Sequence, residues 1–188
     1  DSKSDKDVVL AAIFRIIQAS LIHEDSAATA AKICAQVFAF GKKGHQGWPP
    51  GLVGLISDTA RLRFDFAMDH IIFKMLAEDP SSEHVSIGLQ AVRGLLDDAV
   101  AVRPYAARLS DALAAILRTS DTQVGNLLTT TQARPADVVK SATAVTVFRN
   151  AISLVPRLWP AAMTYGEVGY LLVKCSVPVD ESLAVEAW

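Results

Sequence analysis

Apolar side chains recur every three or four positions along most of this chain, a spacing that places them on one face of a helix. The first such pattern begins after Asp5 or Asp7, either of which suits a helix cap, and the second begins near residue 26. The residues expected to face inward in these two helices are Val9, Ile13, Ile16, Ile17, Leu21, Ala30, Ile33, Cys34, Val37 and Phe38. Gly41 is expected to end the second helix, because Gly and Pro dominate the loop that follows.

The pattern continues through the rest of the chain. Further helices are expected over residues 52–56, 58–76, 82–100, 104–117, 137–154 and 165–175, with a last one starting near residue 180. Asp58 or Thr59 and Asp137 suit the cap positions of two of them. Residues 62–76 are apolar on nearly every side, which is typical of a helix buried between neighbours. Residues 121–136 are expected to be mostly irregular, with room for a single helical turn near residues 124–128, and Pro156 and Pro160 are expected to bound a turn.

These patterns predict an all-α fold. Residues 170–177 are β-like in composition, but they have no partner strand elsewhere in the sequence, so we expect them to be helical as well. Antiparallel helix pairs recur about every 40 residues, which suits stacked units of HEAT or armadillo type. We therefore expect residues 1–188 to form a single α-helical section of an α-solenoid.

The composition narrows the class of protein. With 188 residues, of which 51% are hydrophobic, the chain can fold around a core without a disulfide or a metal. Its 18 Lys and Arg against 20 Asp and Glu give a net charge of −2, which disfavours a nonspecific nucleic-acid binder. No apolar run approaches the roughly 20 residues of a membrane-spanning helix, so we expect no membrane insertion. Cys34 and Cys175 lie far apart in the sequence without metal-ligand spacing, which favours idle thiols in a reducing compartment.

The two ends of the sequence suggest a piece of a longer protein. The polar start over residues 1–7 has no initiator Met and lacks the pattern of a signal or transit peptide. Residues 179–188 stop inside what the pattern predicts to be a helix.

A search for catalytic chemistry finds no motif. The glycines of residues 41–51 lack the strand–loop–helix context of a phosphate loop, and no metalloprotease, esterase or deaminase pattern occurs. His70 has no nucleophile or paired carboxylate at a fixed offset, which favours a structural histidine over a general base. Asp97 and Asp98 are neighbours on a helix and are therefore expected to point in different directions. We expect no enzymatic activity, no cofactor and no metal.

Two further carboxylates share a helix face. Asp65 and Asp69 are four residues apart, so they could together bind a cation. We expect them instead to pair with Arg61 and Lys74 along the same helix, because such pairs are the commoner arrangement.

One loop carries candidate binding chemistry. Lys42, Lys43, His45 and Trp48 combine cationic and aromatic side chains in the Gly- and Pro-rich segment, a combination that suits contact with a partner protein. The alternative is that Trp48 packs back on the helix ends while the lysines keep the loop soluble. The candidate partner contact predicted from the sequence is Lys42, Lys43 and Trp48.

The chain also carries longer stretches that follow one another in a characteristic order. They are RFDFAMDHIIFKML (residues 63–76), VSIGLQAV (85–92), AAILRTSDTQVG (114–125), LTT (128–130) and VFRNAISLVPRLWPAAM (147–163). Together they resemble segments of the Furry family of eukaryotic cell-morphogenesis proteins, and the resemblance covers residues 48–188. The chain departs from the family pattern at Ser120 and Trp159, where the family tends to have an apolar and an aliphatic residue.

The resemblance implies a very large, non-catalytic scaffold of the HEAT/armadillo type. Such proteins act with NDR-type Ser/Thr kinases and their Mob coactivators in cell polarity and morphogenesis, and some associate with microtubules. A cytoplasmic location, at the cell cortex or on the cytoskeleton, is implied as well. This chain would then be an internal section of the N-terminal solenoid, and its cut end at residues 179–188 would expose an apolar face that favours self-association.

Two other classes stay open at this point. An all-helical nucleic-acid-binding or nucleocapsid-like protein would need a basic groove. The cationic candidates for such a groove, interspersed with acidic residues, are Arg103, Arg108, Arg118 and Arg134. A helical small-ligand carrier would need an apolar pocket near residues 64–73.

Overall fold

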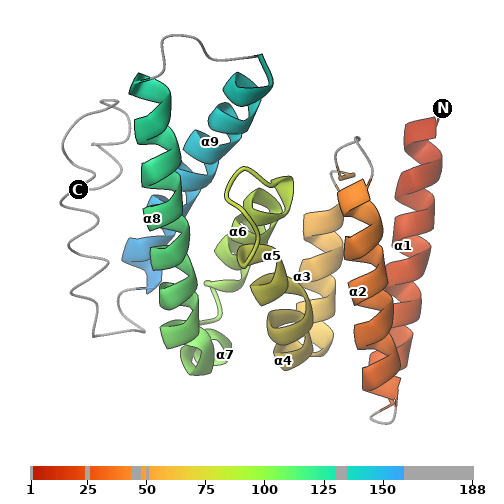
Figure 1. Cartoon of the computed structure of the whole chain (residues 1–188). Helices are drawn as coiled ribbons and strands as arrows, with labels where there is room; N and C mark the ends of the chain where they lie inside the picture. Colours follow the sequence, from red (N-terminus) through yellow and green to blue (C-terminus); the bar gives the residue numbers. More distant parts are fainter. Residues whose placement is uncertain (1, 24–25, 44–47, 50, 130–134, 159–188) are drawn as a thin grey trace. The chain divides into compact units, whose positions relative to one another are not determined.

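In the computed structural model, helices form all the regular secondary structure of the described residues, which are 2–23, 26–43, 48–49, 51–129 and 135–158 (Figure 1). The predicted all-α fold is therefore confirmed for this part of the chain. The contacts between residues divide the chain into two units, Asp1–Lys74 and Met75–Trp188.

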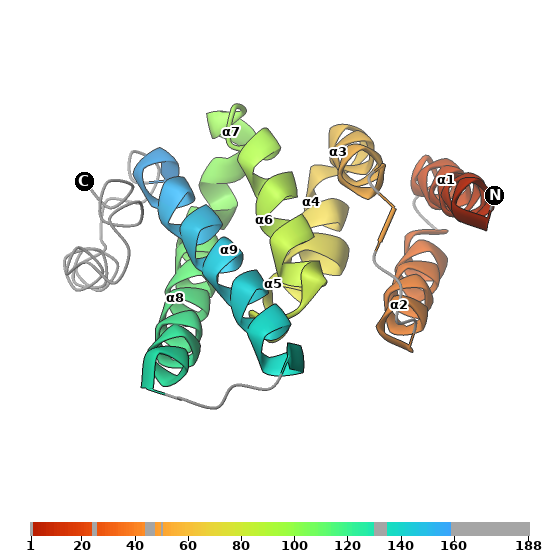
Figure 2. The ribbon, with the colours of Figure 1, turned by 90° about the horizontal axis from the view of Figure 1, so that it is seen from above.

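The first unit contains a helical hairpin. Helices α1 (Ser2–Leu21) and α2 (Ala27–Lys43) run in opposite directions and pack against each other (Figures 1 and 2). Helix α1 also contacts α3 (Leu52–Leu62).

The inward face of α1 differs from the prediction. The buried residues are Leu10, Phe14, Ile17 and Leu21, which recur at spacings of four, three and four. Val9 and Ile16, expected to face inward, are 58% and 57% exposed. Because apolar residues occur nearly all round this helix, the spacing alone could not select the arc that meets α2 and α3. The helix also begins at Ser2, before both expected caps.

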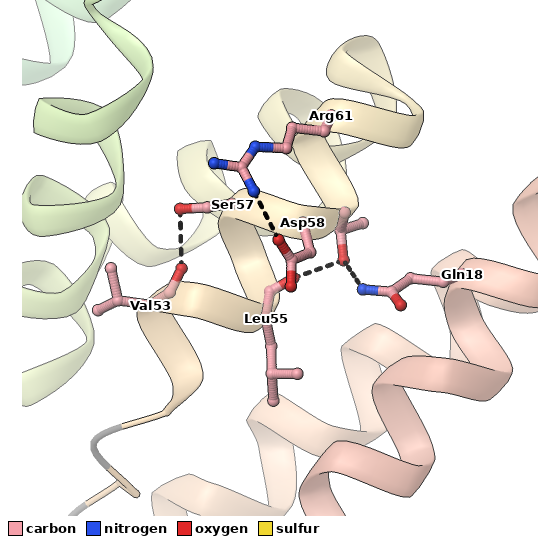
Figure 3. A network of polar contacts seen from close by, with 7 residues as sticks. Gln18, Val53, Leu55, Ser57, Asp58 and Arg61 are labelled. Atoms are coloured by element: carbon pink, nitrogen blue, oxygen red, sulfur yellow. Dashed lines mark hydrogen bonds and ion pairs between the residues drawn. The ribbon is translucent and has the colours of Figure 1, made fainter.

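Helix α3 is longer than expected, because Thr59 lies inside it instead of capping a new helix. Thr59 is fully buried, and its Oγ1 donates to the carbonyl oxygen of Leu55 at 2.8 Å. The same oxygen accepts from Nε2 of Gln18 on α1 at 3.2 Å (Figure 3). A hydroxyl bonded to the carbonyl four residues earlier is compatible with a continuing helix. Asp58 is likewise an interior residue of α3.

The next helical stretch is interrupted by a π-helix. Arg63 has extended backbone, with φ −144° and ψ 91°, and separates α3 from α4 (Phe64–Ala67). The π-helix η2 (Met68–Ile72) and then α5 (Phe73–Leu76) follow directly. The predicted burial of this stretch is confirmed for Phe66, Ala67, Met68, Ile71, Ile72, Phe73, Met75 and Leu76. Leu62, in contrast, is 53% exposed.

The second unit is centred on two long helices. Helices α8 (Ala106–Thr129) and α9 (Pro135–Leu158) run in opposite directions and pack against each other, and α6 (Glu83–Leu95) packs on α9 (Figures 1 and 2). The helix expected over residues 82–100 is shorter than predicted, because α6 ends at Leu95. The short α7 (Ala99–Val102) and a 3₁₀ turn, η3 (Arg103–Tyr105), lead into α8.

Both long helices extend beyond their predicted limits. Residues 121–129, expected to be irregular, belong to α8, whose 3–4 spacing of apolar residues continues through Val124 and Leu128. Helix α9 begins at Pro135, so Asp137 lies in its first turn and is not its cap. Proline at a first helical position loses no hydrogen bond, since its missing N–H would be unpaired there anyway.

The turn expected at Pro156 is wrong, because α9 continues through this residue to Leu158. Leu158 is 2% exposed, and Arg157 is bonded to the end of α6, so contacts on both residues hold this last turn in place. Pro160 and the helices expected over residues 165–188 lie outside the described residues.

Candidate functional site

The three residues of the predicted partner contact lie at or just beyond the C-terminal end of α2. Lys42 and Lys43 are the last two residues of this helix, so Gly41 does not end it. Glycine usually ends a helix by adopting positive φ, and none of the glycines in the described ranges does so. His45 lies outside the described residues.

Trp48 packs against α2. Its ring centroid lies 5.7 Å from that of Phe38, with the two planes tilted by 57°. Phe38 is buried and Trp48 is half-buried. A tilted aromatic pair at this distance is favourable, and it leaves part of the indole accessible. This geometry fits the packing alternative, and the role of Lys42, Lys43 and Trp48 as a partner contact stays a prediction.

The carboxylates near the start of α4 pair differently from the prediction. Arg61 Nη1 donates to Asp58 Oδ1 at 3.0 Å within α3 (Figure 3). Arg63 donates to both carboxylate oxygens of Asp65, through Nε and Nη2, at 3.2 Å each. The extended backbone at Arg63 interrupts the helix between Arg61 and Asp65, so these two do not lie one turn apart on a common helix. The Arg63 hydrogen bond is the main reason that the pKa of Asp65 is lowered from its usual value of 3.8.

Two histidines of the described segments, His70 and His84, lie in packed surroundings, whereas His23 is exposed. His70 is half-buried in η2, with its ring centroid 4.8 Å from that of Phe66. His84 is 4% exposed near the start of α6, and its Nδ1 lies 3.8 Å from Oε2 of Glu78. The backbone N–H of His84 also donates to Ser82 Oγ, which caps α6. The surroundings of His70 fit the structural histidine expected at this position, whose role stays a prediction.

Cys34 is a buried thiol of α2. Burial raises its pKa from 9.0 to about 12, which the charge of Lys74 only partly offsets. Because the thiolate is the reactive species, a thiol with this pKa is a poor nucleophile and a poor metal ligand. The expected idle thiol therefore has a physical basis here, while Cys175 lies outside the described residues.

Asp97 and Asp98 have separate partners, in line with the prediction that they point apart. Asp98 Oδ1 accepts from the backbone N–H of Ala101 at 3.1 Å and caps α7. Asp97 is bonded to Nη2 of Arg157 on α9.

Sequence reasoning missed the role of Arg157 as a link between helices. Besides its bond to Asp97, Arg157 donates through Nη1 to the carbonyl oxygen of Arg93 at 3.2 Å, near the end of α6. Arg93 in turn donates to Ser153 Oγ on α9 at 3.2 Å. The sequence signal that could have pointed to Arg157 was the Pro–Arg pair within residues 147–163, the stretch that resembles the Furry family.

Over the described ranges, no three or more His, Cys, Asp and Glu side chains gather as metal ligands would. Within the part of the chain that the structure describes, none of the helices combines the length and apolarity needed to span a membrane. Compared with protein-family models, with curated proteins and with solved structures, the chain has no match in any of the three comparisons. The resemblance to the Furry family therefore depends on the sequence stretches quoted above.

Proposed function

We propose that this chain is a non-catalytic scaffold segment similar to those of Furry-family proteins, which binds an NDR-type Ser/Thr kinase together with its Mob coactivator. In this proposal its helix pairs belong to an α-solenoid of HEAT or armadillo type. The observation that supports the proposal is that residues of the family-like stretches, among them Gly88 and Arg157, take part in packing and linking the helices.

The first two stretches meet in the core of the second unit. Gly88, in the stretch over residues 85–92, is buried against Met75 and Leu76, which end the stretch over residues 63–76. A Cβ on Gly88 would lie 3.2 Å from Met75 Cβ and 3.1 Å from Leu76 Cδ2. A glycine at this position therefore allows α6 to approach the preceding helix closely, which is a requirement of the fold and not of catalysis.

The later stretches contribute in the same way. Arg157, from the stretch over residues 147–163, joins α9 to the end of α6. Ser120, in the stretch over residues 114–125, is fully buried, which agrees with the apolar residue that the family tends to have there.

The partner and location follow from the family resemblance. The proposed partners are the NDR-type kinase and the Mob coactivator, with microtubules as a further one, and the proposed role is in cell polarity and morphogenesis. The proposed location is the cytoplasm, at the cell cortex or on the cytoskeleton. Lys42, Lys43 and Trp48 are the proposed contact, since they combine positive charge with a half-buried indole.

Calorimetric titration of the chain with a purified NDR-type kinase–Mob complex tests this proposal, with tubulin and single-stranded RNA titrated in parallel. Binding of the kinase–Mob complex at micromolar affinity or tighter would support it. Binding of RNA alone, weakening steeply with salt, would favour a nucleic-acid-binding protein instead. No binding of the kinase–Mob complex would contradict the proposed function.

A matched pair of variants tests the contact itself. Lys42→Glu/Lys43→Glu reverses both charges at the end of α2, while Lys32→Glu reverses an exposed charge elsewhere on the same helix. Loss of kinase–Mob binding in the first variant with retention in the second would place the contact at the end of α2. Equal binding by both would exclude Lys42 and Lys43 from it.

A further inference from the structure

The side of α1 that faces away from its buried residues is apolar and exposed. Among the described residues, the exposed large apolar side chains are Val8, Val9, Ile16, Ile22, Leu62 and Val100, so four of the six belong to α1 or directly follow it. Val8 is 65% exposed and Ile22 is 72% exposed. Single exposed apolar residues are ordinary on a protein surface, but a group on one helix face indicates a binding surface.

Helical geometry places these residues on one arc. At 3.6 residues per turn, three of them, Val8, Val9 and Ile16, fall within about 100° of the α1 circumference together with the small residues Ala12 and Ala19. This set, called here the outer face of α1, consists of Val8, Val9, Ala12, Ile16 and Ala19. Leu10, Phe14, Ile17 and Leu21 lie nearly opposite and are buried within the first unit. Small residues at the centre of the outer face would let a second helix approach closely.

The charged residues along the outer face determine in which orientation a second α1 helix can pack on it. Asp5 is exposed near the start of α1, and Arg15 is exposed in its second half. In a parallel pairing of two α1 helices, Asp5 would meet Asp5, and Arg15 would meet Arg15. In an antiparallel pairing centred near Ala12, Asp5 of one copy lies about 6 Å along the axis from Arg15 of the other. The face is therefore complementary to itself in the antiparallel orientation.

We propose that the outer face of α1 is a homodimer interface, in which the α1 helices of two copies pack antiparallel about a two-fold axis near Ala12. Such an isologous contact uses the same residues on both copies, which matches a self-complementary face. A single pair of helices makes a small interface, so a monomer–dimer equilibrium in the micromolar range is expected. The inference does not depend on the kinase partner proposed above.

Sedimentation equilibrium from about 1 to about 300 μM tests the dimer, because this range brackets micromolar affinity. The wild-type chain is expected to be a concentration-dependent dimer. Ile16→Glu is expected to weaken the dimer by roughly a hundredfold or more, because it would bury a charge in each copy. Val100→Glu, at a residue of α7 that is 85% exposed, serves as the matched control and is expected to dimerise like wild type. Circular dichroism checks that each variant is folded.

Charge reversal tests the orientation. Asp5→Arg and Arg15→Asp are each expected to weaken the dimer by roughly tenfold, and the double variant is expected to recover wild-type affinity. In a parallel dimer each single variant would replace one like-charge pair by another, so neither would weaken the dimer tenfold.

Cross-linking tests the position of the two-fold axis. In a Cys175→Ser background, Ala12→Cys is expected to form an intermolecular disulfide on oxidation, whereas Ala115→Cys, at an exposed position of α8, is not. A wild-type chain that stays monomeric throughout the concentration range would overturn the proposal. So would a dimer that Ile16→Glu leaves intact.

Discussion

At the scale of single residues, Gly88 shows how a close approach depends on the lack of a side chain. The two nearest atoms to a Cβ at this position are 3.1 and 3.2 Å away, which is tighter than normal carbon contacts. One of them, Met75 Cβ, is attached directly to the backbone and has little freedom to move. Gly94, on the same helix, has nothing within 4 Å of the position a Cβ would take.

Gly88→Ala is therefore expected to lower the free energy of unfolding by about 1 kcal/mol, because crowding outweighs the gain in helix propensity. Gly94→Ala is expected to raise it by up to about 1 kcal/mol, since there only the propensity changes. Urea denaturation of the two variants measures both effects. Equal stabilisation by both substitutions would mean that Leu76 and Met75 shift freely.

Ser120 illustrates a buried hydroxyl. Its side chain is fully buried, and its Oγ has no hydrogen-bond partner within the described part of the chain. A buried polar group without a partner loses its hydration without compensation.

Ser120→Ala is expected to raise the free energy of unfolding by about 1 kcal/mol. The neighbouring control is Thr119→Ala, since Thr119 is exposed and its Oγ1 donates to the carbonyl oxygen of Ala115 at 3.0 Å. This control is expected to change stability by less than about 0.5 kcal/mol. Thermal denaturation of both variants measures the difference, and destabilisation by Ser120→Ala would contradict the account.

Asp65 provides a pH-dependent test. Its folded-state pKa is lowered mainly by the Arg63 hydrogen bond, so its ionised form stabilises the fold above the unfolded pKa near 3.8. This contribution is lost as the pH falls through the lower folded pKa. An NMR titration of Asp65 in Arg63→Gln is expected to give a higher pKa than in wild type. The effect on stability is expected to be small, because both side chains are accessible to solvent.

At the scale of elements, the sequence predicted which stretches are helical better than it predicted where the helices end. The apolar spacing of α2 identified its buried residues Ala30, Cys34 and Phe38, because one arc of this helix is clearly apolar. The same spacing could not identify the buried face of α1, because apolar residues occur nearly all round that helix. The residue types of Asp58 and Thr59 also suggested a cap at one or the other, because nothing local indicated that Thr59 would be buried against Gln18.

The contacts that link the ends of different helices could not be predicted from the sequence either. The Arg157 bonds to Asp97 and to the Arg93 carbonyl join residues about 60 positions apart, and no local spacing predicts such a contact. The candidate contact at Lys42, Lys43 and Trp48 was chosen from composition alone. The ring contact between Trp48 and Phe38 could be anticipated as an alternative, but its geometry could not.

Arg157→Ala is expected to lower the free energy of unfolding by about 1–2 kcal/mol, because it removes both the ion pair and a bond to a helix-terminal carbonyl. Asp97→Ala removes only the exposed ion pair and is expected to cost less than about 1 kcal/mol. A double-mutant cycle in urea separates the two contributions. A coupling energy near zero would show that the ion pair with Asp97 contributes nothing, so that the effect of Arg157→Ala comes from loss of the carbonyl contact.

At the scale of the whole molecule, the expected single section is built from two units, each with its own buried residues. Phe14 is fully buried in the first unit and Leu113 is 1% exposed in the second. Loss of either side chain leaves a cavity inside its own unit.

Phe14→Ala and Leu113→Ala are each expected to destabilise their unit by about 3–5 kcal/mol. Hydrogen exchange read by mass spectrometry is expected to increase mainly within residues 2–74 for the first variant and mainly within α8 and α9 for the second. A uniform increase along the chain in both variants would mean that the two units open as one cooperative body.

The π-helix η2 has a consequence for insertions and deletions. The backbone N–H of Phe73 donates to the carbonyl oxygen of Met68, five residues earlier, so this stretch holds one residue more per turn than its flanks. Deleting His70 would allow an ordinary α-helix to form while the residues on both sides keep their facing. A deletion inside α8 would instead turn every later side chain by about 100° out of the core. Length variation in this chain is therefore expected to be tolerated at η2, in the middle of the most buried stretch, where loss of a residue would usually be most damaging.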